Sequence, residues 1–123
     1  MTESIQDGKT TIALGVLTTI ARLTTLKIPG VSRLTPASTG VNRLFKRGQQ
    51  NEGVVIEVRD DTVYADLYIA LINNVNIREV SRNIQTKVAE AISEMVGMQV
   101  GWINIHIEDI DYPEENSEES QNL

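Results

Sequence analysis

Few side chains in this sequence are suited to acid–base or metal chemistry. His106 is the single histidine of the 123 residues, and there is no cysteine. Asp66 and Glu57 are the carboxylates that the strand pattern described below places on one sheet face with His106, so these three could bind a metal ion or serve a general base. Metal sites need three or four converging ligands, and the strand spacing gives these three no shared position. The sequence therefore predicts no catalytic residue, no metal ligand and no cofactor, and we expect His106 to be a partly covered strand residue.

Basic side chains gather in the first part of the chain. There is no acidic residue between Gly8 and Asn51, and the bases there are Lys9, Arg22, Lys27, Arg33, Arg43, Lys46 and Arg47. Arg33, Arg43, Lys46 and Arg47 form a candidate basic patch for phosphates or acidic partners, and the alternative is a solvated loop. The chain lacks the GxxG tetrapeptide of the KH fold, and Glu57 and Asp66 would repel RNA from a sheet surface. Nucleic-acid binding is therefore disfavoured.

Length and composition indicate one soluble domain. A chain of 123 residues can bury one core without crosslinks, and no apolar run approaches the ~18 residues of a membrane span. The net charge is −6, but five of the 17 acids follow Ile110. Residues 111–123 are charged, carry a proline and are almost free of apolar residues, so they are predicted to be a disordered acidic tail on a domain of residues 1–110. The start MTESIQDGK lacks the layout of a signal peptide, which favours a cytoplasmic location.

Two segments have the apolar spacing of helices. In residues 8–27, Ile12, Val16, Ile20 and Leu23 recur every three or four positions, and Leu17 and Ala21 flank the same apolar stripe. This spacing predicts a helix over about 11–27. A second helix is predicted over 77–96, because Asn76 is a good N-cap residue and Gly97 supplies a C-terminal stop. Residues 30–53 between the first helix and the first strand contain four glycines and little periodicity, so they are predicted to form a long basic loop.

Three segments alternate as strands do. They are residues 54–58, residues 62–72 and residues 98–110, and the pair Asp60–Asp61 suggests a hairpin turn between the first two. The order helix, strand, strand, helix, strand predicts an α+β two-layer sandwich, with both helices packed on one face of a three-stranded sheet. The other face would be left bare.

The alternation also predicts what this bare face carries. If Ile56, Leu67 and Ile105 point toward the helices, the bare face holds Glu57, Arg59, Tyr64, Asp66, Tyr68, Ile72, Trp102, Asn104 and His106. Apolar patches on a monomer often mark contact surfaces, so Tyr64, Tyr68, Trp102 and His106 are the candidate interface residues. The alternative is that the rings only cover the sheet.

Three stretches of the chain resemble the alkaline-shock protein family of bacteria, whose members are also described as envelope stress response proteins. They are GKTTIALGVLTTIARLTTLKIPGV at 8–31, GVVIEV at 53–58 and DLYIALINNVNIREVSRNIQTKVAEAISEMVGMQVGWINIHIEDI at 66–110. Asn74 and Arg78 depart from the glycine and proline that are common in the family at these positions. Asparagine tolerates a positive φ, and the second helical position needs no proline, so we expect the fold to be unaffected.

The resemblance implies a class of protein and no reaction. It implies a non-catalytic interaction or scaffold protein of the envelope or alkaline stress response that self-associates into a homo-oligomer and docks partners. It also implies recruitment to the inner face of the cell membrane by a membrane-anchoring protein, since the chain has no predicted transmembrane segment of its own. The alternative from the residues is a small-ligand or RNA-binding module that uses the basic loop over 33–47.

Overall fold

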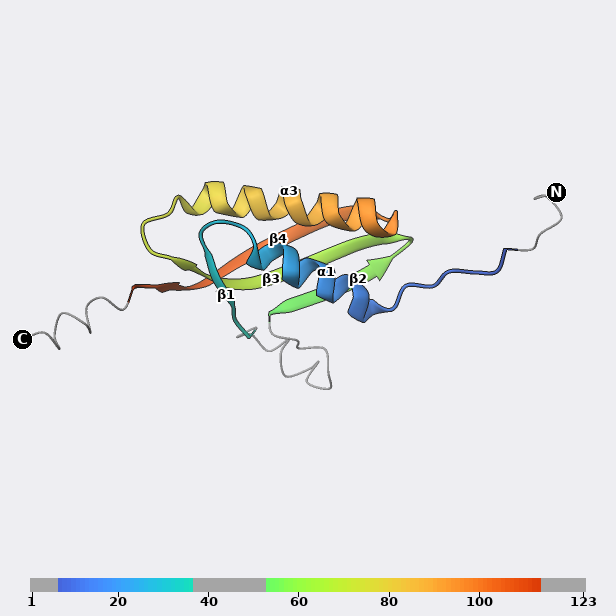
Figure 1. Cartoon of the computed structure of the whole chain (residues 1–123), viewed down its shortest axis with the longest axis horizontal. Coiled ribbons are helices and arrows are strands. Elements are labelled where there is room, and N and C mark those ends of the chain that lie inside the picture. The colour runs from blue at the N-terminus through green and yellow to red at the C-terminus, as the bar shows by residue number, and fades with distance from the viewer. Residues whose placement is uncertain (1–6, 37–52, 114–123) are drawn as a thin grey trace, which may run out of the picture.

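The computed structural model describes residues 7–36 and 53–113 of the chain (Figure 1). Its elements are α1 (Leu14–Leu26), β1 (Val31–Leu34), β2 (Val54–Arg59), β3 (Thr62–Ile72), α3 (Ile77–Val96) and β4 (Gln99–Asp111). Both helices lie on the same face of one sheet and contact each other, which confirms the predicted α+β two-layer sandwich. The division at residue 110 into domain and disordered tail stays a prediction, because residues 114–123 lie outside the described part.

β3 is the centre of the sheet. Its antiparallel partner β2 precedes it across the Asp60–Asp61 turn, in which both residues have positive φ, so the predicted hairpin is present. On its other edge β3 pairs in parallel with β4, and α3 forms the crossover between these two strands. The sheet is therefore mixed, with β4 at one edge.

On the side opposite β4, β3 pairs with two shorter strands, β1 and β2, which lie end to end along it. β1 pairs with the second half of β3, around Ile69–Leu71, while β2 pairs with the first half, over Thr62–Leu67. Residues 31–34, which the sequence assigns to the start of a long loop, thus form a fourth strand. The remainder of that loop, residues 37–52, lies outside the described residues.

α3 has the boundaries and the caps that the sequence predicts. The Asn76 side chain accepts a hydrogen bond of 3.0 Å from the backbone N–H of Glu79, and Gly97 ends the helix in the left-handed conformation with φ 74°. Asn74 has φ 64°, the positive value that asparagine tolerates. Val80, Ile84, Val88 and Ile92 are buried against the sheet.

α1 buries one side of the predicted apolar stripe. Its buried residues are Ile20 from the stripe, the flanking Leu17 and Ala21, and Thr25. Ile12, Val16 and Leu23 are exposed. The helix is apolar on more than one side, so spacing alone fits two stripes, and packing against the sheet selects between them.

Candidate functional site

The bare face is arranged as the alternation predicts. Val63, Ala65 and Leu67 of β3 are buried in the core on the helix side, so the intervening Tyr64 and Asp66 point to the opposite face. Neighbouring strands then place residues of the bare face side by side. The registered pairs are Tyr64 with Glu57, Asp66 with Asn104, and Tyr68 with His106.

One end of the bare face is an aromatic corner formed by Tyr64, Trp102 and Arg59. The Tyr64 and Trp102 rings are 4.8 Å apart between centroids and tilted by 52°, and the Arg59 guanidinium lies 4.3 Å from the Tyr64 ring centroid. Arg59 is held in turn by Glu57, with Nε 2.9 Å from Oε2. Gly101 lies under the Tyr64 ring, where a Cβ atom would collide with the ring carbons. The aromatic corner is therefore braced by residues from three strands.

A polar cluster lies beside the aromatic corner. Asp66 Oδ1 accepts a hydrogen bond of 3.1 Å from the Asn104 amide and is 2.9 Å from His106 Nε2. The His106 ring stacks on Tyr68 with centroids 4.3 Å apart and planes 11° apart. Asp66 and Tyr68 thus fix the position of the imidazole ring from two directions.

The polar cluster contains a carboxylate that orients an imidazole ring, which is one of the arrangements that acid–base catalysis uses. A carboxylate that orients an imidazole is one half of a nucleophile–base arrangement, and the other half is a nucleophile within reach of the ring. Glu57, the third residue considered for a metal site, pairs with Arg59 instead. Within residues 7–36 and 53–113, no group of three His, Asp or Glu side chains could hold a metal ion.

The candidate interface residues share this face but differ in exposure. Trp102 is 43% exposed and stands at the surface of the aromatic corner, whereas Tyr68 is only 6% exposed. A partner that meets the bare face would therefore touch Trp102, while Tyr68 supports His106 from within. Alternation placed Arg59 on the bare face but could not predict its contact with the Tyr64 ring, and Gly101 could not be identified as part of the site from the sequence. The one usable signal is a glycine adjacent to the exposed tryptophan.

Arg33 is the one residue of the candidate basic patch that the structure describes; Arg43, Lys46 and Arg47 lie outside the described residues. Arg33 extends across β3 to β4, where Nε is 2.8 Å from Asp111 Oδ2 and Nη2 is 3.2 Å from Asp109 Oδ2. It passes over Ala70, which is in register with Arg33 on one side and Asp109 on the other and is fully buried.

These contacts shift the ionisation of Asp111. Hydrogen bonds from Arg33 and then from Ser32, whose Oγ donates to Asp111 over 2.6 Å, hold the pKa of that carboxyl below its ordinary value of 3.8. The hydrogen bond to Asp111 likewise raises the pKa of Arg33. Arg33 thus joins the two outer strands of the sheet, and the basic patch as a binding site stays a prediction.

Comparison with known proteins relates the chain to bacterial relatives. The model of the alkaline shock protein 23 family, described as having a cell envelope-related function, matches residues 2–112. YqhY of Bacillus subtilis is 28% identical over 106 residues, covering 85% of this chain and 78% of YqhY. Spy1535 of Streptococcus pyogenes is 31% identical over 104 residues, covering 84% of this chain and 79% of Spy1535.

A solved structure has the same fold. A histidine-to-alanine variant of MamM-CTD matches with a TM-score of 0.50 at 10% identity, covering 80% of this chain and 100% of that chain. At this identity the likeness shows the fold alone. Neither α1 nor α3, the helices of the described residues, combines the length and apolar character needed to cross a bilayer.

Proposed function

Because the chain belongs to the alkaline shock protein 23 family, which is described by its cell envelope-related function, we propose that it is a non-catalytic interaction protein of the bacterial envelope stress response. It acts by self-association and by docking partner proteins on the bare face. It works in the cytoplasm and is recruited to the inner face of the cell membrane by a membrane-anchored protein that it binds.

The observation that carries this proposal is the aromatic corner. Trp102 is 43% exposed, yet the Tyr64 ring beside it is fixed by Arg59, Glu57 and the absence of a side chain at Gly101. Exposed aromatic side chains held in one position make strong interface anchors, because little conformational entropy is lost when a partner covers them. The family description supports an envelope partner.

The polar cluster supports a binding role more than a catalytic one. The Asp66 carboxylate forms hydrogen bonds with both the Asn104 side-chain amide and the His106 ring, so these polar groups are paired with one another on the sheet surface. The polar cluster then lies beside the aromatic corner, as polar residues surround an aromatic centre in many protein interfaces.

Light scattering of the full chain tests the proposal. We expect the wild-type protein to have a mass above 13.6 kDa, and Trp102→Ala to lower that mass at the same concentration. Truncation of a central aromatic anchor raises the dissociation constant by about 30-fold, which corresponds to about 2 kcal/mol. Thr86→Ala, an exposed position on α3, is the matched control and should leave the mass unchanged.

The fold of each variant is checked by circular dichroism. Trp102 is partly exposed, so its loss should cost less stability than the ~3–5 kcal/mol of a buried aromatic residue. If Trp102→Ala is folded and keeps the wild-type mass, the bare face is not a self-association surface. The proposal for that face then fails.

A further inference from the structure

Within the described residues, Asp66 is the charged residue of the bare face that has only uncharged partners. Its Oδ1 atom meets both of them, the Asn104 amide at 3.1 Å and His106 Nε2 at 2.9 Å. The amide is neutral, and so is the imidazole unless it is protonated. Oδ2 makes no hydrogen bond or ion pair with any residue that the structure describes. One oxygen of this carboxylate is therefore available to a partner.

Glu57, the other carboxylate of the bare face, already binds a guanidinium. Arg59 Nε lies 2.9 Å from Glu57 Oε2, and the same guanidinium lies over the Tyr64 ring, 4.3 Å from its centroid. Arg59 therefore combines two interactions that suit a guanidinium, which are an ion pair with a carboxylate and packing on the face of an aromatic ring.

Asp66 and Trp102 form a similar pair, for which the described part of the chain supplies no guanidinium. Asn104 is in register with Asp66, and Trp102 precedes Asn104 by two residues along β4. The contact of Trp102 with the Tyr64 ring, at 4.8 Å between centroids, places the indole on the same face of the sheet. Trp102 is 43% exposed. The bare face thus offers an accessible aromatic ring next to a carboxylate with a free oxygen.

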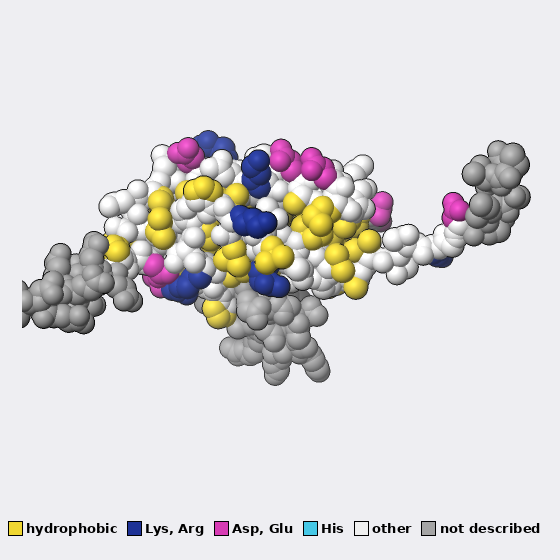
Figure 2. Space-filling view, in the orientation of Figure 1, with side chains coloured by type: hydrophobic (Ala, Val, Ile, Leu, Met, Phe, Trp, Pro, Cys, Tyr) yellow, Lys and Arg dark blue, Asp and Glu magenta, His cyan; other side chains and the backbone are white. Residues whose placement is uncertain are grey.

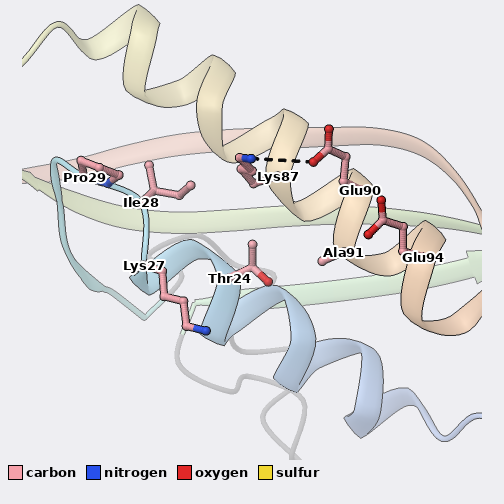
Figure 3. A pocket seen from close by; sticks show the side chains of 8 residues that line it. All are labelled: Thr24, Lys27, Ile28, Pro29, Lys87, Glu90, Ala91 and Glu94. Carbon is pink, nitrogen blue, oxygen red and sulfur yellow. Dashed lines mark ion pairs between the residues drawn. The ribbon is translucent and has the colours of Figure 1, made fainter.

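The acids of α3 differ from Asp66, because bases of the same helix lie among them. α3 contains three bases and three acids. Figure 2 shows basic and acidic side chains next to one another over this helix. Glu90 lies 3.9 Å from Lys87, and Figure 3 shows this ion pair at a hollow that Lys27 also lines. The charges of α3 therefore cancel within the helix, whereas the charge of Asp66 has no such counterpart beside it.

We propose that Asp66 and Trp102 bind an arginine side chain of a partner protein. Its guanidinium packs on the exposed Trp102 ring and donates to Asp66 Oδ2, in the way that the Arg59 guanidinium packs on Tyr64 and binds Glu57. The inference rests on the proposed function, in which a partner protein covers the bare face, and it states the chemistry that the partner brings there.

Desolvation favours a cationic partner group over a neutral or acidic one. A partner that covers Trp102 also removes water from the neighbouring Asp66. A charge that is buried without a partner is strongly unfavourable, so an apolar surface fits poorly here, and an acidic surface is repelled. Arginine suits the pair better than lysine, because its planar guanidinium stacks on the indole ring while it donates to a carboxylate.

A tri-arginine peptide, blocked at both ends, is the probe of this site. Trp102 is the only tryptophan of the chain, so the tryptophan fluorescence of the full chain reports binding at the aromatic corner directly. We expect tri-arginine to change this fluorescence, tri-lysine to bind more weakly, and tri-citrulline, which has a similar shape but no charge, to have no effect. No change with tri-arginine up to about 1 mM, or an equal change with tri-citrulline, overturns the inference.

Asp66→Asn tests the carboxylate. The variant loses the charge but keeps an oxygen that accepts from Asn104 and His106, so circular dichroism should show the wild-type fold. We expect the dissociation constant of fluorescein-labelled tri-arginine to rise by at least about 10-fold. Asp61→Asn is the matched control, because it removes the same charge at the β2–β3 turn, where asparagine tolerates the φ of 63°. Equal dissociation constants for the two variants overturn the inference.

Trp102→Ala gives a second test that does not depend on the fold of Asp66→Asn. It removes the aromatic ring, and we expect the dissociation constant of labelled tri-arginine to rise by about five-fold. The same variant separates the inference from the proposed function. If it loses mass in light scattering but binds tri-arginine as the wild type does, the inference fails and the proposed function stands. If it binds tri-arginine weakly but keeps the wild-type mass, the inference stands and self-association through the bare face fails.

Discussion

At the scale of single residues, the alternation of apolar and polar residues predicts which face of the sheet a residue lies on, but not how exposed it is. The period of two along β3 and β4 is sufficient to put Tyr64, Tyr68, Trp102 and His106 on one face. It is not sufficient to predict their exposure. Tyr68 is buried in the chain and stacks on His106, and this stacking depends on the parallel register of β3 with β4, which residue spacing within either strand does not contain.

The Arg33–Asp111 contact predicts how stability depends on pH. In the folded chain the pKa of Asp111 lies below its ordinary value of 3.8, at which it titrates in the unfolded chain. The contact therefore stabilises the fold above pH 3.8, and this contribution is lost as the pH falls through the lower folded value. We expect Asp111→Asn to lower the free energy of unfolding at pH 7, and this loss to become smaller as the pH falls below 3.8.

Urea denaturation of both proteins over this pH range measures the difference. Asp7→Asn is the control, because Asp7 is exposed and takes no part in this contact. A difference between wild type and Asp111→Asn that does not shrink at all below pH 3.8 would contradict the assignment. Arg33 stays charged throughout, since its pKa is raised.

At the scale of elements, local signals predicted α3 better than β1. α3 has an N-cap, a C-terminal glycine and one apolar stripe, and each of them agrees with the others. β1 is four residues long and follows a proline and a glycine, so no local pattern distinguishes it from a loop. Its pairing with β3 decides its conformation, and pairing between distant segments is not visible in local sequence.

The two halves of the edge strand meet at Tyr68. The Thr35 N–H donates to the Tyr68 carbonyl, and the Tyr68 N–H donates to the Gly53 carbonyl, each over 2.8 Å. Gly53 has φ 87°, and a Cβ atom there would overlap the backbone oxygens of Thr35 and Tyr68. We expect Gly53→Ala to lower the free energy of unfolding by about 3 kcal/mol, from the positive φ and the backbone shift together.

Gly97→Ala is the matched control for this prediction. Gly97 also has a positive φ, 74°, but a Cβ atom there would meet open space. Its replacement should cost about 1 kcal/mol, from φ alone. Equal losses at the two positions in chemical denaturation would show that the close approach at Gly53 does not matter.

At the scale of the whole molecule, the sequence predicts the two layers. It does not predict which apolar residues are exposed on the outer surface of the helical layer. Apolar and polar positions assign both helices to one side of the sheet, because that side needs cover. They do not say which side of the apolar stripe on α1 is buried. The exposure of Val16 and Leu23 is therefore known only from the packing of α1 against the sheet.

Because the edge strand is interrupted between Thr35 and Gly53, we expect the fold to survive a cut in the chain between them. Residues 7–36 and residues 53–113 are each anchored to the other, the first through Leu17, Ile20 and Ala21 in the shared core and through β1 on β3. A chain cut once at a protease site inserted between 37 and 52 should therefore remain a folded non-covalent complex. Its two fragments should elute together, with a thermal midpoint that rises with concentration because unfolding now separates two molecules.

Separately produced fragments should likewise reconstitute the fold on mixing, as judged by circular dichroism and gel filtration. Fragments that part on dilution to micromolar concentration would show that the link is needed. If the fragments reassociate, we expect the chain between Thr35 and Gly53 to accept peptides of other lengths, because Tyr68 holds both ends of the break by backbone hydrogen bonds.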